Sequence, residues 1–150
     1  MSCFSTLLLL RTYIAGWLVM LCVSIANGLV REITYGGWLS ELTAHQVSTV
    51  SGMVALGVVI WLFMLLAPLS TRCQAVALGL FWAGLTIAFE FLFFHYVGGH
   101  TWAELWANYN VLAGRIWIFL VLWIAAAPSL FFHFGLVGKR EREIKGHCSK

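Results

Sequence analysis

The chain has 150 residues, of which 61% are hydrophobic and only 10% charged, and its mean hydropathy is +0.90. Soluble domains carry roughly 25% charged residues, so the composition excludes an ordinary soluble enzyme and predicts a membrane protein. The net charge of +3 comes largely from the basic C-terminal tail at 138–150, which we interpret as a solvated cytoplasmic segment, with contact to anionic lipid as the alternative. The chain has no basic and aromatic surface of the kind that binds nucleic acid.

Four apolar stretches follow one another along the chain, at about 12–30, 46–67, 75–96 and 111–135. A helix needs roughly 20 apolar residues to cross about 30 Å of hydrocarbon, so each stretch is long enough to span a bilayer. The sequence therefore predicts an all-α integral membrane protein, a four-helix bundle that forms one domain over residues 1–150.

The first stretch has a second interpretation as a cleaved signal peptide. Ser24 and Ala26 form a small-x-small pattern after an apolar run, which is typical of a cleavage site. The run is long for a signal peptide, so we favour a transmembrane span. Cleavage of residues 1–26 would leave three spans and the same location for the C-terminus.

Positive charge predicts the orientation in the membrane. Arg11, Arg72 and the basic tail fall on one side of the predicted spans, whereas the other side carries only Arg31 and Arg115. Lys and Arg accumulate in cytoplasmic loops, so both termini and the Arg72 loop are expected in the cytoplasm. The two longer loops then face outward.

Two segments of the chain resemble each other at an offset of 62 positions. "SIANGLVREITYGGWLSEL" at 24–42 and "TIAFEFLFFHYVGGHTWAEL" at 86–105 share a Gly-Gly pair and a Trp followed by Glu-Leu, and Gly52 aligns with Gly114. This pattern predicts two similar helical hairpins in a parallel repeat, related by an axis along the membrane normal. Chance is the alternative, because Gly-Gly pairs are common near helix ends.

The outer loops contain signals for short helices. Thr101 precedes Glu104 by three residues, the capping-box pattern that starts a helix, and apolar residues follow at helical spacing: Trp102, Leu105, Trp106 and Tyr109. We expect a short helix in the outer interface with its indoles in the aromatic belt. In the first loop, Thr43 with Gln46 is expected to start the second span in the same way.

Glu90 is the only carboxylate inside a predicted span. At 1.5 Å per residue it lies roughly 24 Å from the cytoplasmic start of its helix, and Asn27 lies roughly 22 Å from the start of the first helix. Serines of the second span and Arg115 fall near the same height. The flanking phenylalanines, such as Phe89 and Phe91, are expected to face outward.

Polar side chains at this depth cost about 2.5–3.5 kcal/mol when they face lipid, so we expect them to face one another in a layer open to the outside. The candidate residues are Glu90, Arg115, Asn27, Arg31, Ser48, Ser51, His45, His95 and Asn110. The central expectation is a Glu90–Arg115 pair. Side chains tilt toward the helix N-terminus, which pulls this pair apart, so Arg31 with Glu32 or Arg115 with Glu104 is the competing arrangement.

The chemistry of such a layer remains open from sequence alone. Burial favours a neutral carboxyl and a guanidinium favours a carboxylate, so Glu90 suits either a proton carrier or a fixed counter-ion. We therefore expect a protein that binds or passes a small solute or proton, or that docks a membrane partner or another copy of itself.

A membrane enzyme or redox subunit that uses Glu90 with His45, His95 or His100 is one alternative, and an assembly factor without a small-molecule site is another. The sequence has no HxxxH, HExxH or GxSxG motif, and its four cysteines form no CxxC pair. We therefore expect no metal, no cofactor and no disulfide framework.

The segment "GLFWAGLTIAFEFLFFHYVGGHTWAELWANYNVLAGRIW" at 79–117 resembles a set of small four-span bacterial inner-membrane proteins with no assigned activity. The resemblance covers about a quarter of the chain. It implies a multi-pass protein of a bacterial plasma membrane, with the lipid bilayer as its surroundings, and it carries over no functional residues.

Overall fold

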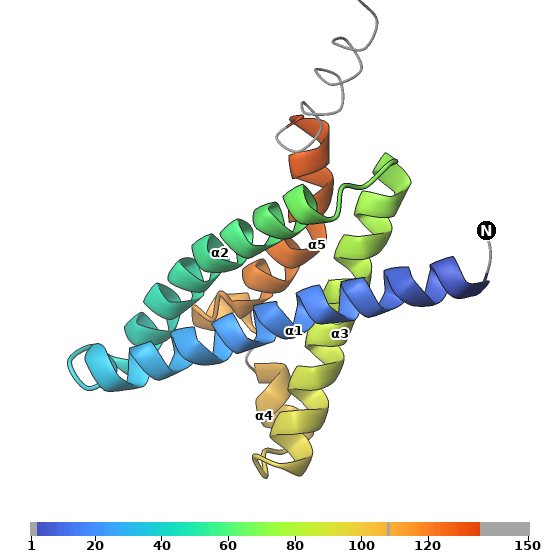
Figure 1. Ribbon diagram of the computed structural model, residues 1–150. Helices are drawn as coiled ribbons and strands as arrows, with labels where there is room; N and C mark the ends of the chain where they lie inside the picture. The colour runs from blue at the N-terminus through green and yellow to red at the C-terminus, as the bar shows by residue number, and fades with distance from the viewer. Residues whose placement is uncertain (1–2, 108, 136–150) are drawn as a thin grey trace, which may run out of the picture.

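The computed structural model describes residues 3–107 and 109–135, and over these residues the fold is all helical (Figure 1). The elements are α1 (Cys3–Thr34), α2 (Glu41–Leu66), α3 (Arg72–Tyr96), α4 (Trp102–Ala107), the 3-10 helix η1 (Val111–Ala113) and α5 (Trp117–His133). The predicted all-α class is confirmed for this part of the chain. The predicted tail at 138–150 lies outside it.

Three helices are long and apolar enough to cross a membrane: Leu9–Thr34 within α1, Glu41–Leu66 and Arg72–Tyr96. The fourth apolar helix, α5, has 17 residues, which corresponds to a length of about 25 Å. It continues through Pro128, which is fully buried.

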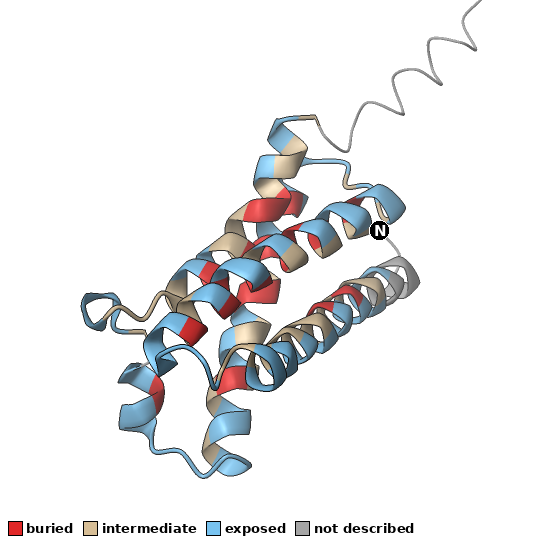
Figure 2. Ribbon diagram, turned by 90° about the vertical axis from the view of Figure 1, so that its left-hand side faces the viewer, coloured by how far each residue is buried: buried red, intermediate tan, exposed pale blue. Residues whose placement is uncertain are grey.

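The long helices run alternately up and down. The start of α1, the α2–α3 connection and the end of α5 lie toward one end of the molecule, and the α1–α2 turn, α4 and η1 lie toward the other (Figure 1). Helix α1 packs on α2, α3 packs on α5, and α2 packs on α5. Buried residues lie on the helix faces that are turned toward one another (Figure 2).

Side-chain caps define the helix starts. Ser40 is the N-cap of α2 and accepts a hydrogen bond from the Thr43 amide, so the prediction that Thr43 and Gln46 begin this helix was wrong. Ser40 stands at the end of the α1–α2 turn, where the first orphan amides need an acceptor. Thr71 and Gln74 form a capping box at α3, which the sequence pattern would have revealed.

Trp82 lies at the centre of the core. Its side chain is 0% exposed, and its indole nitrogen donates to the Tyr13 carbonyl oxygen on α1 at 2.8 Å. Phe63 from α2 packs edge-on against it with ring centroids 5.0 Å apart. Gly16 permits this packing, since a Cβ there would lie 2.7 Å from the Phe63 ring. Three helices therefore meet around one indole.

The closest approach between two helices lies at Gly79. A Cβ at this position of α3 would overlap the backbone carbonyl group of Ala125 on α5. Small residues allow helix backbones to approach closely in membrane proteins, where packing and interhelical hydrogen bonds drive association. The α3–α5 contact therefore requires glycine at this position.

We predict that Gly79→Ala destabilises the protein by on the order of 1–3 kcal/mol, because overpacking forces the backbones of α3 and α5 apart. Gly84→Ala on the same helix is the matched control, since no atom lies within 4 Å of its added Cβ, and the better helix propensity of Ala makes it neutral or slightly stabilising. The measurement is the free energy of unfolding in mixed micelles as the fraction of denaturing detergent rises. Equal stability of the two variants would contradict the close approach.

Candidate functional site

Glu90 is the buried acid of the described residues, at 9% exposure. It lies near the end of α3, and its Oε2 atom accepts two hydrogen bonds. The Tyr109 hydroxyl donates at 2.6 Å and the Trp117 indole nitrogen donates at 2.8 Å. Each donor brings an aromatic ring, so the same residues that satisfy the carboxyl group also surround it with apolar surface.

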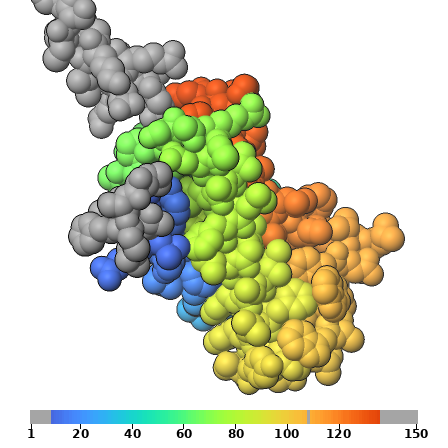
Figure 3. Space-filling model, turned by 90° about the vertical axis from the view of Figure 1, so that its right-hand side faces the viewer, coloured from blue at the N-terminus to red at the C-terminus, as the bar shows by residue number. Residues whose placement is uncertain are grey.

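Packing of α4 on α3 positions the Tyr109 hydroxyl. The Phe91 ring of α3 lies 5.0 Å from the Trp106 ring, 5.7 Å from the Tyr109 ring and 6.2 Å from the Trp102 ring. Figure 3 shows α4 and the segment that follows it against the end of α3. Phe91 therefore packs under α4, and Phe89 packs against Trp17 of α1 with ring centroids 5.8 Å apart. The prediction that these two phenylalanines face outward was wrong.

The connection before α5 positions the second donor. Asn110 caps η1 by accepting from the Ala113 amide at 3.3 Å, and Gly114 then adopts a φ of +79°, in the left-handed region that favours glycine. Gln46 of α2 donates to the Gly114 carbonyl oxygen at 2.9 Å. This turn places Trp117 at the first position of α5, level with Glu90.

Asn27, Ser48 and Ser51 form a second polar group, between α1 and α2. The Asn27 amide nitrogen donates to the Ser48 carbonyl oxygen at 2.8 Å and to the Ser48 hydroxyl at 3.0 Å. The Ser51 hydroxyl donates to Asn27 Oδ1 at 2.8 Å. Gly52 admits the amide, since a Cβ there would lie 3.2 Å from Asn27 Nδ2. These three predicted residues do come together.

Arg31 and His45 form a third group beside the turn that joins α1 to α2. Arg31 pairs with its neighbour Glu32, with Nη2 2.7 Å from Oε1, which is one of the competing arrangements expected from sequence. Its Nη1 atom lies 3.4 Å from Nδ1 of His45. A guanidinium only donates, so this contact needs Nδ1 as acceptor and leaves the proton on Nε2 of His45.

Trp117 joins this third group to Glu90. Its ring lies 6.1 Å from the His45 ring, while its indole nitrogen binds Glu90. The Nε2 atom of His45 is buried and has no hydrogen-bond partner among the described residues. Two titratable side chains on different helices thus flank one indole.

Arg115 lies in the connection between η1 and α5 rather than on a helix. It interacts electrostatically with His45, and within the described part of the chain it is not a hydrogen-bond partner of Glu90. The expected Glu90–Arg115 pair is therefore replaced by Tyr109 and Trp117. Helix α5 begins after Arg115, at Trp117.

His95 and Asn110 lie apart from these groups. The His95 ring stacks on Trp102 at 4.0 Å, and its Nδ1 contacts the His100 carbonyl oxygen at 2.8 Å, so this residue holds the α3–α4 connection. Asn110 is the cap of η1. Both residues position the loop that carries Tyr109.

Sequence reasoning missed Tyr109, Trp117 and Gln46 as members of the site. Tyr109 was assigned to the apolar stripe of the short helix, although a phenol at a half-buried position usually bonds a polar partner through its hydroxyl. That preference was the available signal. The capping box of α4 was predicted and is confirmed, with the Thr101 amide 2.8 Å from Glu104 Oε2.

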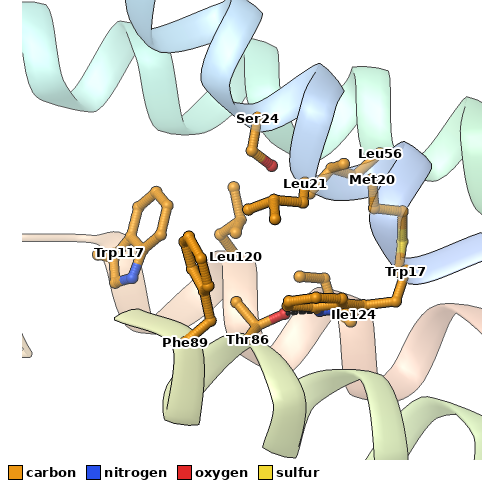
Figure 4. Close-up of a pocket in the computed structure, with 10 residues that line it drawn as sticks. All are labelled: Trp17, Met20, Leu21, Ser24, Leu56, Thr86, Phe89, Trp117, Leu120 and Ile124. Atoms are coloured by element: carbon orange, nitrogen blue, oxygen red, sulfur yellow. Dashed lines mark hydrogen bonds between the residues drawn. The ribbon is translucent and has the colours of Figure 1, made fainter. Parts of the chain in front are cut away.

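A cavity of about 30 Å³ lies among α1, α2, α3 and α5, beside Trp117 (Figure 4). Over the parts of the chain that the structure describes, no group of three His, Cys, Asp or Glu side chains is placed to hold a metal ion. No protein-family model, no curated protein and no solved structure matches the chain. The candidate site is therefore defined by the geometry of its own residues.

We predict that Glu90→Leu destabilises the protein by on the order of 2 kcal/mol, because it leaves the Tyr109 hydroxyl and the Trp117 indole without an acceptor. Glu90→Gln keeps an oxygen that both groups can reach, so its loss should be clearly smaller. The measurement is the same detergent unfolding titration. Equal losses for Leu and Gln would show that the two hydrogen bonds contribute nothing.

Alkaline pH should weaken the contact of Tyr109. Burial, and then the hydrogen bond to Glu90, raise the pKa of Tyr109 above its ordinary value. The folded state therefore holds this proton more tightly than the unfolded chain. The contribution to stability is complete below the unfolded pKa of about 10 and is lost as the pH rises above it.

The test compares the unfolding free energies of the wild type and Tyr109→Phe from about pH 8 to pH 11, a range that brackets the ordinary tyrosine pKa. The wild type should be more stable at the lower end, and its advantage should shrink as the pH rises. A constant difference across the range would contradict the assignment.

Proposed function

We propose that this chain is a four-span, multi-pass protein of a bacterial inner membrane whose outward end takes up and releases a proton at Glu90. Three long apolar helices and the shorter α5 support the four spans. The excess of Lys and Arg on one side supports cytoplasmic termini.

The two hairpins, α1–α2 and α3–α5, support the proposed parallel repeat, since α2 and α5 pack against each other between them. The halves differ in their outer connections. Gly52 lies inside α2, whereas Gly114, its counterpart by sequence, lies in the turn before α5. The second half inserts α4 and η1 there, and this insertion carries Tyr109 to Glu90.

The observation that carries the proposal is the one-sided bonding of the Glu90 carboxyl group. Both donors bind Oε2, and Oε1 accepts no hydrogen bond from the described residues. A proton can therefore join or leave Oε1 while Oε2 stays bound to Tyr109 and Trp117. Donors to a charged oxygen bind about twice as strongly as donors to a neutral one, so protonation weakens the hold on the Tyr109 loop.

A proton fits this site better than a larger solute. Small-molecule sites usually enclose roughly 300–1,000 Å³ and bury most of their ligand. The cavity beside Trp117 measures about 30 Å³, and the larger hollow of about 640 Å³ beside Gln46, Ser51 and Ile116 is an open groove with a mostly apolar lining. His45 supplies a second titratable group, whose ring lies 6.1 Å from the Trp117 ring, nearer the α1–α2 turn. A proton is the species that both groups can bind.

The proposal is tested by infrared titration of the protein in lipid nanodiscs. Beyond the bands of the other five glutamates, the wild type should show one carbonyl band of a protonated carboxyl group that changes with pH, and Glu90→Gln should lose that band alone. Glu104→Gln is the matched control, because Glu104 is exposed and its Gln variant keeps the capping box. A band that survives in Glu90→Gln would overturn the proposal and favour docking of a membrane partner as the role of this end.

A further inference from the structure

The cavity beside Trp117 has two hydroxyl groups in its otherwise apolar wall. Ser24 from α1 and Thr86 from α3 line it on opposite sides, and Figure 4 shows the Ser24 hydroxyl directed into the space between these helices. The remaining lining residues are Trp17, Met20, Leu21, Leu56, Phe89, Trp117, Leu120 and Ile124. Hydroxyls from two helices thus face one small space.

Both hydroxyl groups can form further hydrogen bonds. Thr86 Oγ1 donates to the Trp82 carbonyl oxygen at 2.9 Å and accepts from the Trp17 indole nitrogen at 3.2 Å, so one lone pair remains. Among the hydrogen bonds of the described residues, none involves the Ser24 hydroxyl. A hydroxyl carries one donor and two acceptor sites, so Ser24 has all of its capacity available.

The volume of the cavity is enough for a water molecule. A buried water needs at least about 10–15 Å³ of such space and two to four polar partners, and this cavity offers about 30 Å³ and two hydroxyls. Larger polar ligands do not fit. A wholly apolar cavity of this kind would stay dry, so the two hydroxyls decide its occupant.

We infer that this cavity is a water-binding site, in which one or two ordered waters bridge Ser24 on α1 to Thr86 on α3. The water donates to the free lone pair of Thr86 Oγ1 and exchanges a hydrogen bond with the Ser24 hydroxyl. On α1, Trp17, Met20, Ser24, Asn27 and Arg31 follow at alternating spacings of three and four, so they share one face. Ser24, Asn27 and Arg31 are the polar residues of this face, and the water lies beside Ser24, the one farthest from the α1–α2 turn.

The water would complete the contact between α1 and α3. That contact otherwise contains the Trp17–Thr86 and Trp82–Tyr13 hydrogen bonds, and water-mediated bonds are nearly as favourable as direct ones. This inference is independent of proton binding at Glu90. Each one can fail while the other holds.

The test uses methyl-labelled protein in nanodiscs and NMR detection at Leu120 and Ile124, which are 3% and 2% exposed and line the cavity. Wild-type methyl groups should receive magnetisation from water and should show no xenon-induced shift. The Ser24→Ala, Thr86→Val double variant should lose the water transfer and gain the xenon shift, because its cavity is apolar. The exposed Leu80 reports xenon dissolved in the lipid.

Thr49→Val is the matched control, since Thr49 is buried on α2 and its hydroxyl donates to a carbonyl one turn back, as Thr86 does. It should behave like the wild type. If the double variant fails to fold, Ser24→Ala alone removes one water partner without breaking a direct hydrogen bond, and should reduce the water transfer. Xenon shifts of equal size in the wild type and the variants, or no water transfer in the wild type, would overturn the inference.

Discussion

The arrangement of the α4–α5 end of the molecule depends on one requirement, that a carboxyl group on an apolar helix must find hydrogen-bond donors. Glu90 finds them in Tyr109 and Trp117, which come from the connection after α4 and from the first position of α5. Three features of this part of the chain place Tyr109 and Trp117 beside Glu90. The ring of Phe91 packs against Trp106 of α4. Asn110 caps η1, and Gly114, in the left-handed conformation, turns the chain toward α5. The loop is therefore ordered by the acid that it covers.

Aromatic donors suit this position better than a guanidinium. A buried ion pair removes two charges from water, and the cost often exceeds the attraction gained, whereas a phenol and an indole satisfy the carboxyl group without a second charge. Arg31 and Arg115 lie near His45 instead, where both are partly exposed. The carboxyl group therefore has two neutral donors on one oxygen and no cation among its hydrogen-bond partners in the described residues.

Interhelical hydrogen bonds and one close glycine contact join the helices, beside the apolar core. Helix α1 is fixed by side-chain hydrogen bonds from Trp82, Trp17 and Asn27, and helix α3 meets α5 at Gly79. In a bilayer the lipid tails are as apolar as the helix surfaces, so close packing and interhelical hydrogen bonds provide the specificity.

The sequence by itself determined the helical class, the apolar stretches, the capping box at Thr101 and the isolation of Glu90, because these follow from residue type and spacing along one helix. The rise of about 1.5 Å per residue was also enough to predict that Asn27 lies at the same height as the serines on α2. Only the tertiary structure decided the partners of Glu90, which lie 19 and 27 residues away. Periodicity tells which residues share a face, but the rotation of each helix and the path of a loop depend on contacts among all of them. A left-handed glycine and a docked tyrosine, rather than the heights of residues on ideal helices, therefore determined which groups surround the acid.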